Sequence, residues 1–236
     1  MAVVDGANGT LQLITGSGAM LWRVDGLATP VAVACLDDLY VVERGASRIS
    51  VWDTTGKLLR SFPIDTVLPN GIGAGPNHGE LTVTDTGRGR AIVIASSTGQ
   101  FLRAIGNGVL ASPAGVAISN GRIAIADAGL GRVAIFDANG TLLQTIGDST
   151  LLVRPQGLAW DAANTRLVVS DSFSGELVVL GEEGTVRGSL AGFGTAAGQL
   201  INPIDVALVP GGLLAVTTAG GTISEFHLFN SLAPVA

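Results

Sequence analysis

A proline followed by a short apolar segment recurs about every 40 residues, and this repeat constrains the fold more than any other feature of the chain. The copies begin at Pro30, Pro69, Pro113, Pro155 and Pro203, at intervals of 39, 44, 42 and 48 residues. A repeat of roughly 20–50 residues is typical of solenoids and propellers, in which one small structural unit is built several times.

Two further motifs recur in phase with the proline segments. The first is a strand that ends in an acid before a glycine-rich turn; its acids are Asp5, Glu43, Asp85, Asp127 and Asp171, and a sixth copy has Thr218 instead. The second is a turn glycine before a further strand, at Gly18, Gly56, Gly99, Gly140 and Gly184. Each repeat therefore predicts four short antiparallel strands, which we call a, b, c and d.

The turns between these strands are short. Asn120-Gly121 and Asn139-Gly140 are typical of two-residue hairpin turns, because both central positions of such turns favour residues that tolerate a positive φ. Several of the strands, such as 123–126 and 167–169, are apolar without alternation, which indicates that both of their faces are buried.

Sheets that pack face to face around a common axis bury both faces and leave only short edges. A linear solenoid would need distinct caps, and none is evident. We therefore predict an all-β, six-bladed β-propeller of four-stranded antiparallel blades, which forms a single domain over residues 1–236. The blades are expected at approximately 1–26, 27–64, 65–107, 108–148, 149–194 and 195–236.

The first and last blades are predicted to be incomplete. The first begins at strand b, and the last stops after strand c. Residues 233–236 resemble the proline segment at 29–32, so we expect residues 230–236 to pair with the first blade and close the ring. The incomplete ends also suggest a trimmed chain.

The repeat combines Pro-x-Gly-Val-Ala, a strand ending in Asp with Arg-Val-x-Ile-Phe-Asp after the turn, and Asn-Gly-x-Leu-Leu-x-x-Ile-Gly. It resembles the NHL repeat, and the best copy, at 113–147, matches at Pro113, Gly115, Val116, Ala117, Asp127, Arg132, Val133, Phe136, Asp137, Gly140, Ile146 and Gly147. The resemblance covers essentially the whole chain and implies a propeller, but no particular function, because the family includes receptors, scaffolds, RNA binders and a few enzymes. It also favours an extracellular or periplasmic location.

Charge and cysteine content narrow the classes of partner. The chain has 13 basic and 19 acidic residues, a net charge of −6, and Lys57 is its only lysine. A protein that binds nucleic acid or anionic membranes normally carries a clustered basic surplus, so neither partner is expected. No apolar run is long enough for membrane insertion, and residues 1–5 do not resemble a signal peptide. Cys35 is the only cysteine, which excludes an intrachain disulfide, and we expect it to be buried.

No coherent catalytic set emerges from the sequence. His78 and His227 are the only histidines, whereas the amidating lyases of the NHL family need a histidine-rich metal centre. There is no Gly-x-Ser-x-Gly nucleophile motif. The repeated acids are followed five residues later by arginines, as in Glu43 and Arg48, and recurrence in most blades favours a structural hairpin clasp over an active site.

One group of residues suggests a metal site. Asn70, Gln156 and Asp205 lie at the start of strand a in three repeats, where their oxygens are expected to face the central pore as hard ligands suited to Ca²⁺. Residues 68–71 also resemble the asparagine motif of calcium-dependent lactonases of the gluconolactonase type, although the other acid and asparagine positions of that family are not matched. The other interpretation is a set of pore-lining polar residues bound to water.

A binding face is predicted where the b–c turns and the d–a connections emerge on the same side of the blades. Its candidate residues, which combine arginines with apolar side chains, are Arg44, Arg88, Leu130, Phe173, Ser174, Arg154 and Phe193. The other interpretation is that apolar residues of the connections, among them Leu110 and Leu152, fill gaps between blades. We predict a monomeric, non-catalytic module without a cofactor that binds or scaffolds a protein, peptide or glycan; the alternative is a Ca²⁺-dependent hydrolase or lactonase.

Overall fold

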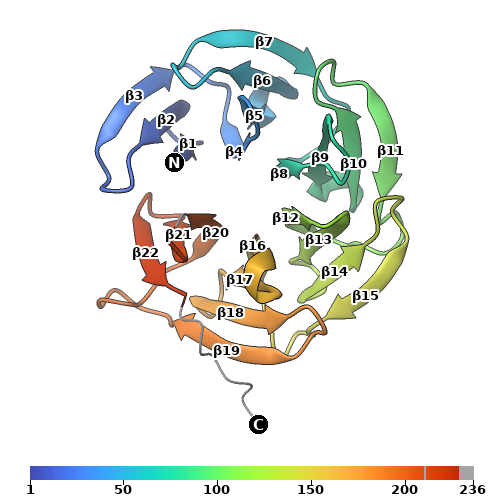
Figure 1. Ribbon diagram of the computed structural model, residues 1–236, viewed down its shortest axis with the longest axis vertical. Helices are drawn as coiled ribbons and strands as arrows, with labels where there is room; N and C mark the ends of the chain where they lie inside the picture. Colours follow the sequence, from blue (N-terminus) through green and yellow to red (C-terminus); the bar gives the residue numbers. More distant parts are fainter. Residues whose placement is uncertain (210, 229–236) are drawn as a thin grey trace. The chain divides into compact units, whose positions relative to one another are not determined.

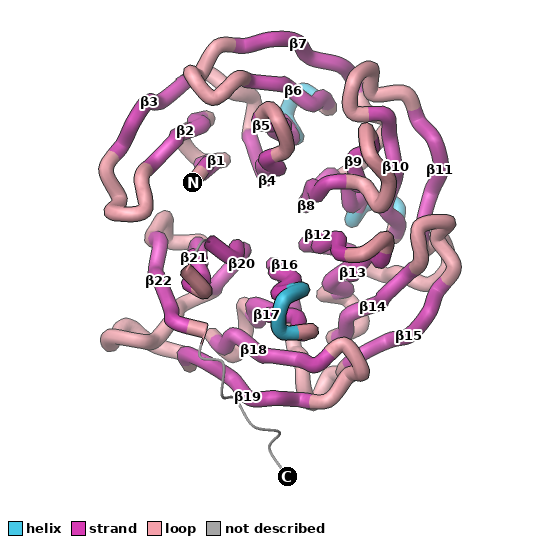
Figure 2. Tube along the Cα trace, in the orientation of Figure 1, coloured by secondary structure: helices cyan, strands magenta, loops and turns pink. Residues whose placement is uncertain are grey.

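A computed structural model describes residues 1–209 and 211–228, and nearly all of its regular structure is β-strand (Figure 2). The helices found in these residues are three turns of 3₁₀-helix at Arg44–Ala46, Thr86–Arg88 and Ala162–Asn164, each three residues long. No helix in the described part of the chain has the length and apolar character needed to cross a membrane.

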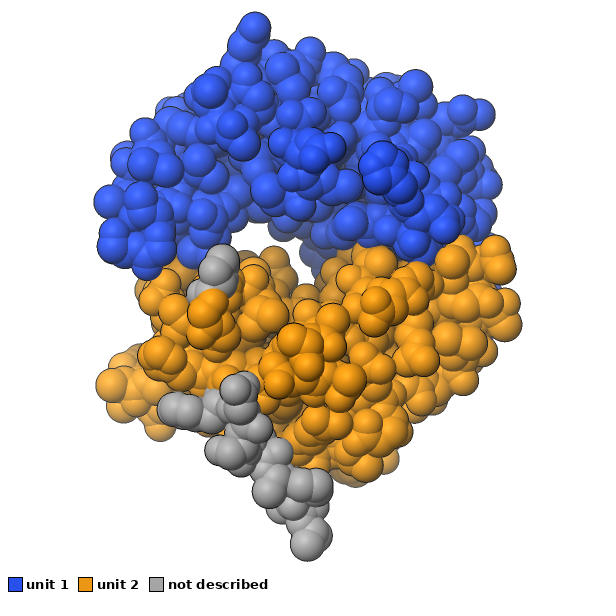
Figure 3. All heavy atoms as spheres, viewed as in Figure 1, with its two compact units in different colours: residues 1–109 blue, residues 110–236 orange. Residues whose placement is uncertain are grey.

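The chain divides into two compact units, Met1–Val109 and Leu110–Ala236, which Figure 3 colours separately. Unit 1 contains three antiparallel sheets, labelled in Figure 1. Blade 1 has β1 (Ala2–Asp5), β2 (Thr10–Ile14) and β3 (Met20–Asp25). Blade 2 has β4 (Pro30–Cys35), β5 (Leu39–Glu43), β6 (Arg48–Trp52) and β7 (Leu58–Pro63). Blade 3 has β8 (Pro69–Ala74), β9 (Glu80–Asp85), β10 (Arg90–Ala95) and β11 (Phe101–Ile105).

Unit 2 contains the other three sheets. Blade 4 has β12 (Pro113–Ser119), β13 (Arg122–Asp127), β14 (Arg132–Phe136) and β15 (Leu142–Ile146). Blade 5 has β16 (Pro155–Asp161), β17 (Arg166–Asp171), β18 (Glu176–Gly181) and β19 (Val186–Ala191). Blade 6 has β20 (Pro203–Val209), β21 (Leu213–Thr218) and β22 (Ile223–His227).

This architecture confirms the predicted six-bladed β-propeller with incomplete first and last blades. Asp5 ends β1, so blade 1 begins at strand b as expected, and blade 6 has strands a to c within the described residues. Residues 230–236, which the sequence predicts to close the ring, lie outside the described residues.

Apolar clusters between neighbouring blades form the core within each unit. In unit 1, one cluster joins blades 1 and 2 and another joins blades 2 and 3. In unit 2, one cluster joins blades 4 and 5 and another joins blades 5 and 6. The runs 123–126 and 167–169 are at most 1% exposed, which confirms that both faces of these strands are buried.

The repeat prolines begin strand a in every blade that has one, and all five are buried. Proline suits the first position of a strand, because no backbone N–H is needed there for the hydrogen bonds of the sheet. The pairing register with strand b shifts directly after each proline. The glycine that follows in several blades permits close packing: a Cβ on Gly157 would lie 2.5 Å from the Cα of Asp205, and one on Gly115 would meet the Gln156 carbonyl oxygen.

Two local predictions are wrong. Asn120-Gly121 forms the expected tight turn with both residues at positive φ. Asn139-Gly140 instead lies in a longer loop, in which the Asp137 N–H donates to the Thr141 carbonyl and the Gly140 N–H donates to the Asp137 carbonyl. The Asp137 carboxylate accepts hydrogen bonds from the N–H groups of Asn139 and Thr141 and so favours this loop. Cys35 is exposed rather than buried, because it is the last residue of β4 and points away from the core that Ala34 enters.

Candidate binding surface

The repeated acids fasten the b–c turn of each blade to the connection that leads into strand a. In blade 4, the fully buried carboxylate of Asp127 accepts hydrogen bonds from the N–H groups of Ala111 and Ser112 at 3.0 and 2.9 Å. It also accepts one from Gly129 in its own turn, at 3.2 Å. Turn and connection therefore lie together, as predicted.

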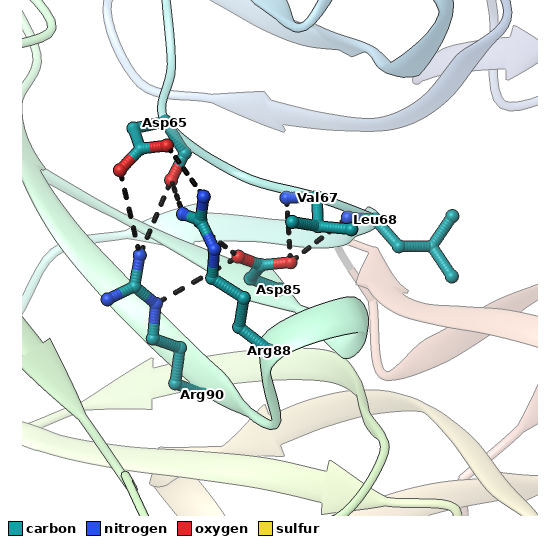
Figure 4. A network of polar contacts seen from close by, with 6 residues as sticks. All are labelled: Asp65, Val67, Leu68, Asp85, Arg88 and Arg90. Atoms are coloured by element: carbon teal, nitrogen blue, oxygen red, sulfur yellow. Dashed lines mark hydrogen bonds and ion pairs between the residues drawn. The ribbon is translucent and has the colours of Figure 1, made fainter.

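Blade 3 shows the same clasp with arginines added (Figure 4). Asp85 accepts hydrogen bonds from the N–H groups of Val67 and Leu68 at 3.1 and 3.0 Å. Arg88 and Arg90 each lie 3.9 Å from its other carboxylate oxygen. Both arginines also contact Asp65 in the connection, so their charges are already neutralised within the blade.

In blade 2, Glu43 is fully buried and binds the Arg48 guanidinium through two hydrogen bonds of 3.0 Å. Burial alone would raise the pKa of this carboxyl, but the hydrogen bonds from Arg48 and from the Ala28 N–H outweigh burial and lower the pKa. Clasps of this kind in successive blades support the structural interpretation of the acid–arginine motif.

The apolar residues of the predicted face divide into two classes. Leu110 and Leu152 are buried, at 6% and 0% exposure, so they fill gaps between elements. Leu130, Phe173 and Phe193 are 43%, 61% and 63% exposed. This second group therefore does not fill gaps between elements, and its side chains lie at the surface.

Exposed residues surround the b–c turn of blade 5; we call this group the blade-5 face and define it by Val153, Arg154, Phe173, Phe193 and Ile201. The backbone of this turn touches both flanking connections. On one side, the Ser172 N–H donates to the Arg154 carbonyl at 3.0 Å. On the other side, a Cβ on Gly175 would lie 2.7 Å from the Phe193 Cα and 2.6 Å from the Leu200 carbonyl oxygen.

Exposed apolar residues dominate this face. Val153 and Ile201 are each 44% exposed, beside the more exposed Phe173 and Phe193. Arg154 is also exposed, and its side chain makes no hydrogen bond or ion pair within residues 1–209 and 211–228. Exposed aromatic rings around a positive charge are typical of protein interaction sites.

The other predicted face residues have internal roles. In unit 1, Arg44 donates to the Pro69 carbonyl at 2.9 Å and to the Asn70 side-chain oxygen at 3.2 Å. Arg88 pairs with the acids of blade 3, as described above. In unit 2, Ser174 shapes the blade-5 turn: its N–H donates to Asp171, and its hydroxyl oxygen accepts from the Glu176 N–H.

The three candidate calcium ligands are divided between the units. Asn70, in unit 1, already has its side-chain oxygen bound by the Arg44 guanidinium, which opposes a second cation at that atom. In unit 2, Asp205 lies against Gly157, the residue after Gln156. Asp205 is exposed, yet the surrounding protein removes much of the water from its carboxylate, and this desolvation raises its pKa to about 6 against the hydrogen bond from the Val206 N–H.

Two open grooves lie among the a–b and c–d turns, at the end of the blades away from the b–c turns. One, of about 500 Å³ in unit 2, includes Glu182, whose carboxylate already accepts from Arg122 and Trp160. The other, of about 230 Å³ in unit 1, includes Glu80, whose carboxylate is bound by two nitrogens of Arg103. His78 lines this second groove and is exposed, and His227 is exposed in β22.

Three residues on or beside the blade-5 face were not predicted from the sequence. Val153 and Ile201 look like ordinary gap-filling residues, and only the tertiary structure shows that they are exposed. Glu176, by contrast, could be found in the sequence, because it occupies the position five residues after the repeat acid where blades 2, 3 and 4 have arginine. Within residues 1–209 and 211–228, no group of three or more His, Cys, Asp or Glu side chains could hold a metal ion.

Half of the chain is similar in sequence to a known protein. Protein brain tumor of Drosophila melanogaster is 32% identical over 126 residues, which cover 50% of this chain but only 12% of the Drosophila protein. No protein-family model matches the chain.

Solved structures resemble the chain over nearly its whole length. A streptogramin B lyase structure matches 99% of this chain and 80% of its own, with a TM-score of 0.69 and 15% identity. A chain of a nidogen/laminin complex matches 93% of this chain and 89% of its own, with a TM-score of 0.70 and 18% identity. A protein of unknown function from Bacteroides caccae matches 96% of this chain and 89% of its own, with a TM-score of 0.73 and 13% identity. At these identities the likeness concerns the fold alone, and the chain has the fold of a six-bladed β-propeller.

Proposed function

We propose that this chain is an NHL-type propeller that acts as a non-catalytic binding module, with the blade-5 face as its contact surface for a protein or peptide. The NHL assignment rests on the in-phase proline, acid and glycine motifs. The similarity of half the chain to Protein brain tumor supports it.

The observation that carries the proposal is the exposure of Phe173 and Phe193 on adjoining segments. Two phenylalanines that are 61% and 63% exposed leave a large apolar area in water, and burial of this area by a partner is favourable. The clasp hydrogen bonds of Asp171 fix the turn that carries Phe173, so little conformational entropy is lost when a partner binds.

The similarity to propellers of known structure is compatible with a binding role. One of them belongs to a nidogen/laminin complex and another is a streptogramin B lyase, so the fold serves both assembly and chemistry in other proteins. In this chain, the clasp carboxylates and arginines are used within their own blades. A binding role is the function that these contacts support best.

Selection from a peptide display library provides the test, with Phe173→Asp as the disruptive variant. We expect selected peptides to bind the wild type and to bind Phe173→Asp at least about tenfold more weakly. Phe101→Asp is the matched control, because Phe101 is 52% exposed on β11 in unit 1. Equal loss in both variants, or none in either, would count against the blade-5 face.

Glycans are the other partner class expected from the sequence, and the same variants test them. A glycan array probed with the wild type and with Phe173→Asp shows whether the blade-5 face accepts a sugar instead of a peptide. Binding of a glycan that survives Phe173→Asp would place the contact surface elsewhere on the chain.

A further inference from the structure

This inference rests on the proposed function and concerns the chemistry of the partner at the blade-5 face. The clasp of blade 5 departs from the repeat at one position. In blades 2, 3 and 4 the residue opposite the clasp acid is an arginine, through the pairs Glu43 and Arg48, Asp85 and Arg90, and Asp127 and Arg132. In blade 5 that position is Glu176.

The strand register places Glu176 beside the clasp acid. Strands β17 and β18 pair through Ser170 and Leu177, so Asp171 and Glu176 face each other one step further along the ladder. Two like charges at opposed positions of a sheet are unfavourable, whereas a carboxylate and an arginine attract. Blade 5 therefore carries an acid where blades 2, 3 and 4 carry a cation.

The two carboxylates of this pair differ in how they are satisfied. Asp171 is 1% exposed and accepts hydrogen bonds from the N–H groups of Arg154, Phe173 and Ser174 at 2.9, 2.9 and 3.1 Å. Glu176 is half-buried, and its carboxylate makes no hydrogen bond or ion pair within the described ranges 1–209 and 211–228. Its acceptor capacity remains available to a partner.

Two exposed phenylalanines lie on segments next to Glu176. Phe173 belongs to the turn that ends at Glu176, and Phe193 follows the strand β19 that pairs with β18 beside it. The one cation of the face, Arg154, lies on the other side of Asp171, in the connection before β16. Glu176 lies on β18, which pairs with β19, so it is on the side of the blade-5 sheet away from β16 and the connection that carries Arg154.

We infer that Glu176 receives an arginine or lysine side chain of a protein partner, with apolar partner residues packed against Phe173 and Phe193. The incoming cation supplies the charge that Arg48 and Arg90 supply internally in their blades. A guanidinium also interacts favourably with the face of an aromatic ring, and both phenylalanine rings are exposed. The net charge of −6 favours the approach of a basic segment.

The experiment compares two acetylated and amidated peptide libraries that share apolar flanking positions. One has a fixed central arginine and the other a fixed central glutamate; binding is measured by fluorescence polarisation at 50 and 300 mM NaCl. The arginine library is expected to bind the wild type at least about tenfold more tightly than the glutamate library. The affinity is expected to fall at the higher salt concentration.

Glu176→Arg is the decisive variant, because it restores the residue found in other blades. We expect it to keep or raise the melting temperature and to weaken binding of the arginine library by about tenfold or more. Glu176→Gln, which keeps the shape and removes the charge, is expected to show a smaller loss. Glu225→Arg, an exposed glutamate in β22, is the charge-matched control and is expected to bind like the wild type apart from a small uniform change.

The outcomes separate this inference from the proposed function. If Phe173→Asp abolishes peptide binding while Glu176→Arg and Glu176→Gln bind the arginine library like the wild type, the face is a binding surface but the inferred cation pocket is wrong. Preference for the glutamate library, or binding of neither library, also overturns the inference. Peptide binding that is unaffected by Phe173→Asp contradicts the proposed function itself.

Discussion

Removal of one clasp carboxylate tests how the blades are held together. Asp127→Ala takes away the acceptor for three N–H groups, those of Ala111, Ser112 and Gly129, and leaves them without this partner. These hydrogen bonds join the b–c turn of blade 4 to the connection before strand a. The variant should therefore loosen both segments while the strands themselves stay paired.

The loss of unfolding free energy in Asp127→Ala can be calculated from these three hydrogen bonds. They are only partly buried, so water can replace part of what is lost, and each is worth about 1 kcal/mol in net terms. The free energy of unfolding should fall by about 3 kcal/mol. A chain of 236 residues has an unfolding entropy of about 0.5 kcal/mol/K, so the melting temperature should fall by about 6 °C.

Differential scanning calorimetry measures this shift, and Asp137→Ala is the matched control in the same blade. Asp137 also accepts two backbone hydrogen bonds, but in an exposed turn where water readily takes its place. Its melting-temperature shift should be less than about a third of the Asp127→Ala shift. Equal shifts in the two variants, or a fall of less than about 2 °C for Asp127→Ala, would refute the clasp reasoning.

Three further predictions concern strand a and its surroundings. Gly157→Ala should destabilise the protein by about 1–3 kcal/mol in urea unfolding, because the added Cβ meets the Asp205 backbone, whereas Gly16→Ala, with open space around it, should be neutral. Asp205→Asn should raise the melting temperature at pH 7.5 and leave it unchanged at pH 4. The folded-state pKa of Asp205, about 6, lies above its ordinary 3.8, so the wild type loses stability as the pH rises through this interval; a lower melting temperature for the variant at pH 7.5 would contradict this. Addition of Ca²⁺ should leave the melting temperature unchanged, because Arg44 already occupies the Asn70 side-chain oxygen; a calcium-dependent rise would support the lactonase alternative.

The repeat alone predicts the strand plan of this chain because each of its marker residues has a defined backbone role. Buried prolines such as Pro113 begin strand a, and clasp acids such as Asp127 end strand b. Glycines such as Gly140 and Gly184 take the positive φ of the c–d turns. These roles are local, so they can be read without knowledge of the tertiary structure.

The errors arise where local patterns compete or where tertiary packing decides. Asn139-Gly140 resembles a two-residue turn. The Asp137 carboxylate, however, accepts hydrogen bonds from the N–H groups of Asn139 and Thr141, and these bonds stabilise a longer loop. Cys35 belongs to an apolar run, yet its place at the end of β4 exposes it. An apolar run has the same composition at its end as in its middle, so the exposure of its last residue is decided by the tertiary structure.

The candidate site could be predicted only in part. Leu152 and Phe193 both lie in d–a connections and are both apolar, yet one is fully buried and the other is 63% exposed. Their exposure depends on contacts with other segments, which sequence periodicity does not encode. Glu176 is different: alignment of the repeats places it opposite Asp171, where three other blades have arginine, so its unusual charge was open to prediction.

The footprint of a bound peptide on the wild-type protein, measured by amide hydrogen–deuterium exchange with mass spectrometry, tests the blade-5 face most directly. If the peptide binds the blade-5 face, exchange slows in the complex at residues 172–176 and 192–201, with little change in the grooves around Glu182 and Glu80. Protection at those grooves, or in the b–c turns of unit 1 while 172–176 and 192–201 stay unchanged, would contradict binding at this face.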